Sequence, residues 1–435
     1  MSNYTLGIDI GTTSICAIAV DRKSRQTLCT LNKANTSSIV SPLPFARIQE
    51  PSVIIDTALS LLHELEEKFG VPDSIGVTGQ MHGIVYVNKV GTAVSPLYTW
   101  QDARGAQETE EGETYIERIK RLTGYTVASG YGLATHYYNQ NNGEVPSDAA
   151  KLCTIHDHLA MTLAGLSYPI IHSSNAASLG LYNLKNDQFD TSAVEALGMS
   201  ADILPEVTAD SKPIGYYKDA VPVYVAIGDN QASFLGSAGE KEGRLLVNIG
   251  TGSQVSVIGR LGKTNPAIEC RPFINGKYLL VGCSLCGGRA YAVLEKFFRD
   301  VANMCGADIR SAYPFMDKCI AGRTCDSSLS VSTLFDGTRQ SPDVRGSISG
   351  ISVTNLTPET MMWGFMRGIA HELHTLYKDM EEFVNMDITE MIGSGNGLRV
   401  NPALCKTMES IFEMPLTLSQ SKEEAALGAA IFAIK

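Results

Sequence analysis

Two stretches of the chain share one pattern: an apolar strand, a Gly-Thr turn and a second apolar strand. Residues 6–20 read LGIDIGTTSICAIAV, and residues 245–259 read LLVNIGTGSQVSVIG. Because a supersecondary unit that recurs about half a chain later indicates a duplicated architecture, the pattern predicts two structurally related halves. Two unrelated hairpins that share common turn residues are the alternative interpretation.

Helical and strand patterns alternate along the rest of the chain. Residues 53–69 carry a helical stripe of apolar side chains that ends before Gly70, and residues 74–79 read as a short buried strand. The Thr-Pro-Glu of residues 357–359 predicts the start of a long helix. The Ser-x-x-Glu of residues 421–424 predicts a capping box for the last helix. This alternation is typical of an α/β protein.

The boundary between the two halves is expected within residues 236–242, between an Ala- and Gly-rich segment and the second hairpin. No low-complexity linker separates the halves. We therefore expect an N-terminal domain over residues 1–238 and a C-terminal domain over residues 239–435.

Composition narrows the classes of partner. The chain has 435 residues, of which 44% are hydrophobic and 19% charged, as is ordinary for globular proteins. The net charge of −11 argues against nucleic acid, because phosphate backbones need clustered Lys and Arg. No apolar run approaches the ~18 residues of a membrane span, and no signal peptide is evident. The ten cysteines form no framework, so we expect reduced thiols and a cytoplasmic location.

The turn of the first hairpin supplies groups that can hold phosphate. Gly11 lets the backbone approach a ligand, and the hydroxyls of Thr12 and Thr13 can join the turn amides in binding phosphate oxygens. Asp9 precedes the turn and can hold Mg²⁺ through water. The second turn lacks the acid and consists of Gly250, Thr251 and Gly252. One such turn would be an ordinary hairpin feature, but two can clamp a polyphosphate; neither is a Walker A loop.

A candidate catalytic base follows the apolar residues 221–227, which read as a strand that ends in Gly228-Asp229. The carboxyl ends of strands in α/β sheets face the ligand crevice. A carboxylate there can accept the proton of a hydroxyl that attacks a γ-phosphate. From position alone, an Asp229 that caps the following helix is the simpler interpretation.

Two further motifs offer sugar-binding chemistry: Gly-Gln-Met-His-Gly at residues 79–83 and Thr-Trp-Gln-Asp-Ala-Arg at residues 99–104. Sugars are bound by an apolar surface together with several directed hydrogen bonds, and these motifs contain both kinds of group. The candidate residues are Gln80, Met81, His82, Trp100 and Asp102. Taken singly, a Trp in the core and a His in a structural hydrogen bond are the simpler interpretations.

A glycine-rich loop, Gly-Ser-Gly-Asn-Gly at residues 393–397, follows a short apolar strand and precedes a helix that Asn401 and Pro402 begin. Such a loop can hold the base and ribose of a nucleotide, and its candidate residues are Gly395, Asn396 and Asn401. An ordinary flexible connection is the alternative.

Taken in order, these motifs resemble the FGGY family of carbohydrate kinases. The resemblance extends from GIDIGT at residues 7–12 to EAALGAA at residues 424–430. It implies two related domains of the actin, hexokinase and Hsp70 type, which are ribonuclease H-like, with ATP and a sugar bound in the cleft between them. It also implies a sugar kinase that uses ATP and Mg²⁺.

The resemblance implies a role for each motif. Asp229 matches the family's catalytic base, and Asp9 matches the acid near Mg²⁺ and phosphate. The sugar-side positions are Gln80, Met81, His82, Trp100, Asp102, Tyr131 and Asn230. The phosphate- and ATP-binding positions are Gly11, Thr12, Thr13, Gly250, Thr251, Gly252, Gly395, Asn396 and Asn401, in addition to Asp9.

Within the family, the sequence looks more like the sedoheptulokinases than the xylulokinases. Both share the motif of residues 79–83, but residues 99–102 and the Ala-Ser-Gly-Tyr-Gly of residues 128–132 look like the sedoheptulokinase version. Xylulokinases tend to have Asn at the position of Gln101. We therefore expect phosphoryl transfer to a primary hydroxyl of a ketose, with sedoheptulose ahead of xylulose, another pentulose or a polyol.

Two other classes of function stay open at this point. A non-catalytic sugar sensor would not need the acids Asp9 and Asp229, and an actin-like or chaperone-type ATPase would not need Met81, His82 and Trp100. No exposed stripe defines an oligomeric state, so a homodimer also stays open.

Overall fold

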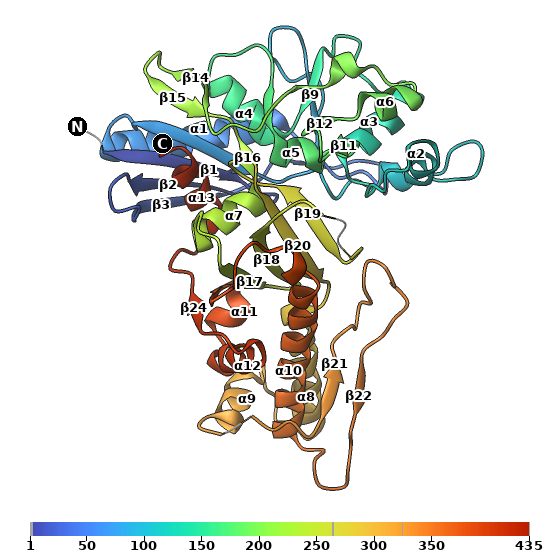
Figure 1. Cartoon of the computed structure of the whole chain (residues 1–435), viewed down its shortest axis with the longest axis vertical. Helices are drawn as coiled ribbons and strands as arrows, with labels where there is room; N and C mark the ends of the chain where they lie inside the picture. Colours follow the sequence, from blue (N-terminus) through green and yellow to red (C-terminus); the bar gives the residue numbers. More distant parts are fainter. Residues whose placement is uncertain (1–2, 263–264, 324, 435) are drawn as a thin grey trace. The chain divides into compact units, whose positions relative to one another are not determined.

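The computed structural model describes residues 3–262, 265–323 and 325–434, which fold as two compact units (Figure 1). The first unit contains the chain up to Gly239, the short segment Arg271–Lys277 and the chain from Glu423 onward. The second unit contains Glu240–Cys270 and Tyr278–Lys422. A mixed β-sheet lies at the centre of each unit.

In the first unit, the described strands form a seven-stranded sheet in the order β14–β15–β6–β1–β2–β3, with β16 also paired to β6. Its strands are β1 (Tyr4–Ile10), β2 (Ser14–Asp21), β3 (Thr27–Ala34), β6 (Ser74–Gly79), β14 (Pro213–Tyr217), β15 (Val221–Tyr224) and β16 (Ile227–Gly228). β1 pairs antiparallel with β2 and parallel with β6. The carboxyl ends of β1, β6 and β16 therefore meet at one edge of the sheet.

Helices cover both faces of this sheet. Successive side chains of β2 point to opposite faces of the sheet, and on each face they pack against different helices. Ala17 and Ala19 pack in one cluster with α1 (Pro51–Phe69) and α4 (Ile155–Leu163), whereas Cys16 and Ile18 pack against the last helix on the other face. The predicted helix over residues 53–69 and the strand over residues 74–79 are both confirmed, and Gly70 ends α1 with a φ of 81°.

The last helix, α13 (Glu424–Phe432), belongs to the first unit, although we expected it in the C-terminal domain. It packs on α7 (Asp229–Ala238), and a Cβ at Gly428 would lie 1.8 Å from the carbonyl oxygen of Ala232. Only glycine allows this close approach. The predicted capping box is wrong, because Glu423 is the N-cap residue and no side chain caps the helix.

The rest of the first unit packs around a second, aromatic-rich core that contains Tyr86, Tyr98, Tyr115 and Tyr137. Its short strands are β4 (Ser38–Ile39), β5 (Ile48–Gln49), β7 (Val85–Val87), β8 (Leu97–Tyr98), β9 (Lys151–Cys153), β10 (Ile170–His172), β11 (Tyr182–Asn183), β12 (Gln188–Phe189) and β13 (Glu206–Thr208). Its helices are α2 (Tyr115–Thr123), α3 (Gly132–Asn141), α5 (Ser173–Ser178) and α6 (Thr191–Ala196).

The second unit repeats the central arrangement of the first. Its described sheet has six strands, in the order β19–β20–β18–β17–β23–β24. These are β17 (Arg244–Ile249), β18 (Ser253–Gly259), β19 (Ile268–Pro272), β20 (Tyr278–Ser284), β23 (Glu390–Ser394) and β24 (Leu416–Leu418). β17 pairs antiparallel with β18 and parallel with β23, as β1 does with β2 and β6. The predicted duplication is confirmed.

Helices also build the core of the second unit. They are α8 (Gly287–Met304), α9 (Tyr313–Ile320), α10 (Pro358–Lys378), α11 (Asn396–Arg399) and α12 (Pro402–Phe412), and a ribbon of β21 (Ser330–Ser332) and β22 (Ser347–Ser349) packs beside α10. α10 begins as predicted, with Thr357 as the N-cap residue and Pro358 in the first turn.

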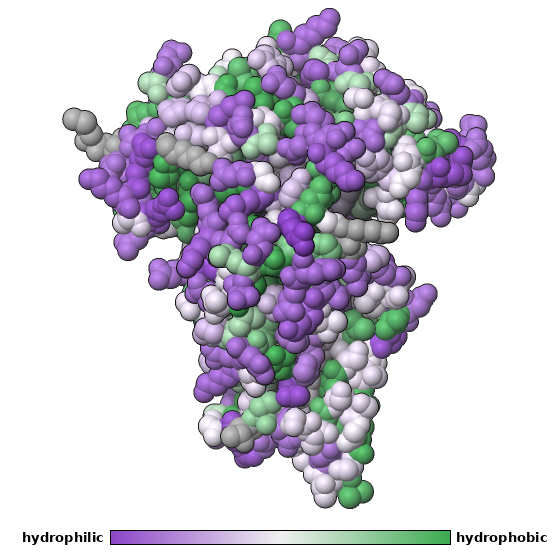
Figure 2. Space-filling view, in the orientation of Figure 1, coloured by the Kyte–Doolittle hydropathy of each residue, from purple (hydrophilic) through white to green (hydrophobic). Residues whose placement is uncertain are grey.

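Hydrophilic side chains dominate the face of the molecule that Figure 2 shows, with apolar ones scattered between them. In the part of the chain that the structure describes, no helix is long and apolar enough to cross a membrane.

Candidate active site

The turn between β1 and β2 is as tight as predicted. Gly11 donates its backbone N–H to the carbonyl oxygen of Ser14 (2.9 Å), and a Cβ at Gly11 would lie 2.8 Å from that oxygen. Thr12 and Thr13, which follow Gly11, line a pocket of about 450 Å³. Its other polar lining residues are Asn35, Ser38, Ser41, Arg47, Gln49, Thr99 and Gln101.

Side chains from three other segments hold Thr12 in place. The indole Nε1 of Trp100 donates to Thr12 Oγ1 (3.0 Å), which in turn donates to Gln80 Oε1 (3.3 Å). Gln49 closes the ring: it accepts from Gln80 Nε2 (2.8 Å), and its own Nε2 donates to the carbonyl oxygen of Thr12 (2.9 Å). The structure therefore brings two predicted sugar-side residues into contact with the predicted phosphate turn. Gln49 was not predicted, because no motif surrounds it.

Asp9 lies near the end of β1 in an acidic environment. Burial, together with the negative charges of Asp229 and Glu423, raises the pKa of its carboxyl group to about 7. Like charges disfavour ionisation only when they lie close together. The electrostatics thus place the two predicted acids, Asp9 and Asp229, in one site of the first unit.

Asp229 is the first residue of α7 and directly follows β16. The N-cap residue is Gly228, so Asp229 lies in the first turn of the helix and not at the cap position. The alternative role at the helix start is met in part, because the backbone of Asn230 donates a hydrogen bond to the Asp229 carboxyl group. Burial raises the pKa of the Asp229 carboxyl group to about 6, while the charge of Arg271 and a hydrogen bond from the backbone of Asn230 act in the opposite direction. At neutral pH this group is mostly ionised and can accept a proton.

Three of the predicted sugar-side residues have defined packing: Met81 lies beside the residue that precedes Asp229, and His82 and Tyr131 lie against each other. The thioether of Met81 packs against Gly228, since a Cβ there would lie 2.7 Å from the Met81 sulfur. The ring of His82 stacks on Tyr131, with centroids 4.5 Å apart and planes 8° from parallel, and His82 Nδ1 lies 2.8 Å from the carbonyl oxygen of Ser178. His82 has a φ of 73°, a strained value that is frequent at ligand-binding positions.

Asn230, another predicted sugar-side residue, has a side-chain acceptor that no described residue satisfies. Its Oδ1 is buried and has no hydrogen-bond partner among the residues that the structure describes. Because buried polar atoms in native proteins nearly always find a partner, such an atom beside Asp229 fits a site that a sugar completes.

Asp102 does not face a ligand, in contrast to its predicted sugar-side role. Its side chain is fully buried, and its oxygens accept from Arg104 Nε (2.8 Å) and from the backbone N–H of Arg47 (2.9 Å). Arg104 is itself buried, lies over the ring of Tyr98 and also pairs with Glu144 (3.0 Å). A buried guanidinium needs a carboxylate partner, and this need explains the acid at position 102.

In the second unit, backbone groups at the start of α8 hold the turn between β17 and β18. Gly250 donates its N–H to the carbonyl oxygen of Gly252 (2.9 Å). Gly288 and Arg289 then donate their N–H groups to the carbonyl oxygens of Gly250 (2.9 Å) and Thr251 (3.0 Å). The second predicted phosphate turn is therefore fixed by main-chain contacts, without the side-chain ring that holds the first.

A pocket of about 710 Å³ adjoins this turn and contains four of the six predicted phosphate- and ATP-binding residues of the second unit. Gly250, Thr251, Asn396 and Asn401 all line it. The sequence did not predict its other lining residues, which include Gly288, Arg289, Tyr291, Tyr313, Asp317 and Leu404. Gly395 lies behind the pocket: its φ is 83°, and a Cβ there would lie 2.5 Å from the carbonyl oxygen of Ile249.

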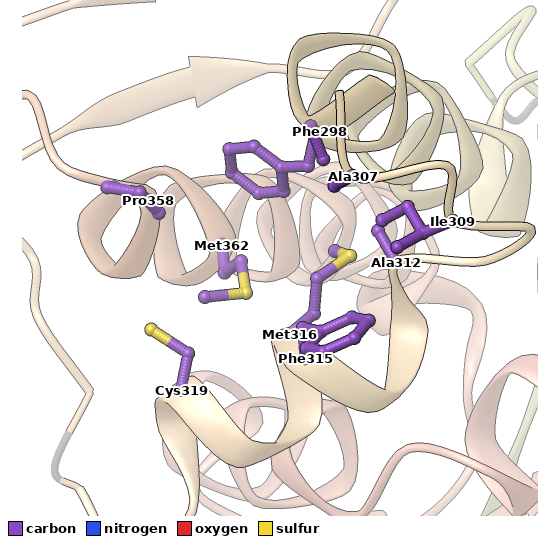
Figure 3. Close-up of a pocket in the computed structure, with 10 residues that line it drawn as sticks. Phe298, Ala307, Ile309, Ala312, Phe315, Met316, Cys319, Pro358 and Met362 are labelled. Atoms are coloured by element: carbon purple, nitrogen blue, oxygen red, sulfur yellow. The ribbon is translucent and has the colours of Figure 1, made fainter. Parts of the chain in front are cut away.

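A different pocket of the second unit, about 380 Å³ in volume, lies between α8, α9 and α10 (Figure 3). Phe298, Phe315, Met316 and Met362 point into it, and the remaining lining residues are also apolar apart from the thiol of Cys319. It offers no charged group or hydrogen-bonding side chain for a phosphate or a sugar, so it is not a candidate for the reaction site.

Comparisons with known proteins agree with these features. The model of the FGGY family of carbohydrate kinases, N-terminal domain, matches residues 4–236, and that of the C-terminal domain matches residues 245–435. The sedoheptulokinase of Mus musculus is 27% identical over 470 residues, which cover 98% of this chain and 96% of the relative. The xylulose kinase of Staphylococcus xylosus is 24% identical over 465 residues, which cover 99% of this chain and 90% of the relative.

Solved structures show the same fold. The xylulose kinase from Rhodospirillum rubrum superimposes with a TM-score of 0.84 at 22% sequence identity, over 99% of this chain and 89% of that structure. At this identity the likeness establishes a two-domain α/β architecture rather than a particular sugar.

Proposed function

The chain belongs to the FGGY family of carbohydrate kinases, and from this premise we propose that it transfers the γ-phosphoryl group of ATP to a primary hydroxyl of a ketose, with sedoheptulose as its preferred sugar. The observation that carries the choice of sugar is the match to a sedoheptulokinase, which extends over 98% of this chain at 27% identity. The residues 99–102 and 128–132 support the same choice.

Asp229 is proposed as the general base. The hydroxyl oxygen attacks the γ-phosphorus and forms the new O–P bond, while its proton passes to the Asp229 carboxylate. The bond between the γ-phosphorus and the bridging oxygen breaks, and ADP leaves with the electron pair. A pKa of about 6 lets Asp229 be ionised before the reaction and hold the proton as the hydroxyl loses it.

The acidic pair Asp9 and Asp229 fits Mg²⁺. This cation prefers oxygen ligands, and it keeps most of its waters while one or two carboxylates and the substrate phosphates hold it. Within the described ranges, no group of three or more His, Cys, Asp or Glu side chains gathers as metal ligands. When bound, Mg²⁺ would neutralise phosphate charge, and Asp9 would orient it through water.

The remaining predicted residues bind and orient the substrates. In this proposal, Thr12, Thr13 and the turn Gly250–Gly252 contact phosphate oxygens. The adenosine part lies against Gly395, Asn396 and Asn401. The sugar contacts Gln80, Met81, His82, Trp100, Tyr131 and Asn230, and Asp102 positions the loop beneath them through Arg104.

The ten cysteines are free thiols in the structure, which supports the further proposal of a reducing, cytoplasmic location. A homodimer stays an open expectation that analytical ultracentrifugation can test.

A panel of ketoses and polyols tests the proposed sugar. ADP release is measured with sedoheptulose, xylulose, ribulose, gluconate and glycerol, and the sugar phosphate is identified by mass spectrometry. We expect kcat/KM for sedoheptulose to exceed that for xylulose at least about tenfold, which corresponds to ~1.4 kcal/mol of transition-state binding. If another sugar has a higher kcat/KM than sedoheptulose, that sugar is the preferred substrate and the proposed choice is wrong. ADP release without any sugar would point to an ATPase, and sugar binding without ADP release to a sensor.

A further inference from the structure

One short segment of the second half of the sequence, Arg271–Lys277, belongs to the first unit. It begins at the end of β19 and reaches the start of β20, and its turn passes through Asn275 and Gly276, whose φ values are 57° and 69°. Most of the second half of the sequence packs around the other sheet. The side chains of residues 271–277 therefore belong to the first unit, which also contains the proposed base Asp229.

The segment is anchored on α7, the helix that begins with Asp229. Gln231 Nε2 donates to the carbonyl oxygen of Pro272 (3.0 Å). The rings of Phe234 and Phe273 meet edge to face at 5.6 Å, and both side chains are buried. A hydrogen bond from Phe273 N to the carbonyl oxygen of Lys277 (2.9 Å) closes the turn. These contacts fix the backbone on either side of Pro272 relative to the first turn of α7.

Arg271 directly precedes this anchor, and its guanidinium lies close enough to Asp229 for its positive charge to stabilise the Asp229 carboxylate. Two acidic groups also lie in this region, because the negative charges of Asp229 and Glu423 both act on Asp9. Phosphoryl transfer next to Asp229 brings further negative charge into this region. A cation held at this position by a rigid anchor can offset that charge without reorganisation.

We propose that Arg271 is a catalytic residue of the kinase reaction and that its guanidinium contacts the phosphoryl group as this group passes from ATP to the hydroxyl held by Asp229. The planar fork of a guanidinium binds two phosphate oxygens at once, which an ammonium cannot do. The hydroxyl proton goes to Asp229 and the electron pair of the broken bond to ADP, so Arg271 stays protonated throughout. The inference deepens the proposed function and rests on its assignment of Asp229.

The packing contacts distinguish Arg271 from its neighbours. Pro272 and Phe273 attach the segment to α7, so removal of the Arg271 side chain leaves the anchor in place. Lys277 lies at the other end of the same turn and provides a matched control of equal charge. Arg271→Lys retains the charge but loses the fork.

Steady-state kinetics of full-length Arg271→Ala, Arg271→Lys and Lys277→Ala test the proposal, with the sugar that the wild type phosphorylates fastest. We expect Arg271→Ala to lower kcat by about 10²–10³-fold, with a smaller change in the KM for the sugar. Arg271→Lys should be faster than Arg271→Ala and should recover about a tenth to a third of the loss in log kcat. The kcat of Lys277→Ala should stay within about twofold of the wild-type value. Thermal denaturation should show similar melting temperatures for all four proteins.

The same measurements can overturn the proposal. An Arg271→Ala variant with kcat within threefold of the wild type, or an equal loss in Lys277→Ala, would exclude contact with the transferred group. A loss confined to KM would make Arg271 a binding residue only. These outcomes are separate from the sugar panel, because preference for a sugar other than sedoheptulose leaves the comparison of variants unchanged. Full turnover in Asp229→Ala would remove the premise of both proposals.

Discussion

The two hairpins that repeat along the chain have the same strand pairing but are held by different means. The β1–β2 turn is tied by the side chains of Trp100, Gln80 and Gln49, whereas the β17–β18 turn rests on backbone N–H groups at the start of α8. Asp9 in the first hairpin corresponds to Asn248 in the second. Asn248 donates to Ser394 Oγ (2.7 Å), while Asp9 is electrostatically coupled to Asp229.

This difference indicates how one duplicated scaffold can take on two tasks. In the second hairpin, the backbone N–H groups of Gly288 and Arg289 donate to carbonyl oxygens of the turn, so the turn keeps its shape without any particular side chain. A carboxylate with a raised pKa suits a site that handles a proton and a cation. In the proposed function the first unit contributes the chemistry and the second unit the nucleotide pocket, and four experiments test this division of roles.

The largest effect is expected from Asp229→Ala. Removal of the base should lower kcat by about 10²–10⁴-fold, because the hydroxyl then loses its proton acceptor. Binding of ATP, followed by isothermal titration calorimetry, should be retained because the proposed nucleotide pocket is lined by residues of the second unit. Asp229→Asn, which keeps the shape but not the basicity, should behave in the same way. Wild-type turnover in either variant would show that Asp229 is not the general base.

Asp9→Asn makes the first hairpin resemble the second. We expect a loss of about 10²-fold in kcat and a higher Mg²⁺ concentration at half-maximal rate, since an amide holds the hydrated cation less well than a carboxylate. Asn248→Ala is the matched change in the second hairpin and should cost less than about tenfold, because it removes one neutral hydrogen bond. Equal losses in the two variants would show that the hairpins do not differ in function.

The pH dependence of kcat/KM should show the ionisation of Asp229. Its pKa is raised to about 6, and only the ionised form accepts a proton, so activity should fall as pH falls through that value. One pH unit below the pKa, about a tenth of the molecules carry the ionised base, which predicts a roughly tenfold loss. The rate at saturating Mg²⁺ and ATP, measured against pH for the wild type, checks this. A constant rate down to pH ~5 contradicts the assignment of the pKa or of the base.

The smallest effect is expected from Gln49→Leu, which opens the side-chain ring around Thr12. Loss of two hydrogen bonds should lower the free energy of unfolding by about 1–3 kcal/mol and kcat/KM by up to about tenfold. Urea denaturation and steady-state kinetics measure the two quantities. Gln107→Leu, which removes one hydrogen bond outside this ring, is the control and should affect stability but not kcat/KM. Unchanged kinetics in Gln49→Leu would show that the ring does not position the turn.

Local patterns predicted the parts of the fold that depend on neighbouring residues. The hairpins, α1 and the start of α10 follow from apolar periodicity, turn glycines and the cap at Thr357, and the structure has them where they were predicted. The place of α13 could not be predicted in this way. Its side chains are apolar on all faces, so the sequence shows that it is buried but not which unit covers it.

The candidate site shows the same limit. Spacing predicted Gly250, Thr251, Asn396 and Asn401 as nucleotide residues, and these four residues line one pocket. Their contact with a nucleotide stays a prediction. The burial of Asp102 against Arg104, which does not fit its predicted sugar-side role, could not be predicted because nothing in the local sequence shows that Arg104 is buried. Neither Gln49 nor Arg271 lies in a recognisable motif. The position of Gln49 depends on the long-range pairing of β5 with β8. The position of Arg271 depends on the anchoring of residues 271–277 on α7.

The return of α13 to the first unit has a consequence for how the protein is made. The ribosome completes nearly all of the second unit before residues 424–432 emerge, and at about 5–20 residues per second this delay lasts on the order of ten seconds or more. During this interval the groove of α7 around Ala232, where Gly428 later packs, is open to water or to chaperones. The unit that carries the proposed base is thus the last to be finished, so a nascent chain cannot become active before its second unit has been synthesised.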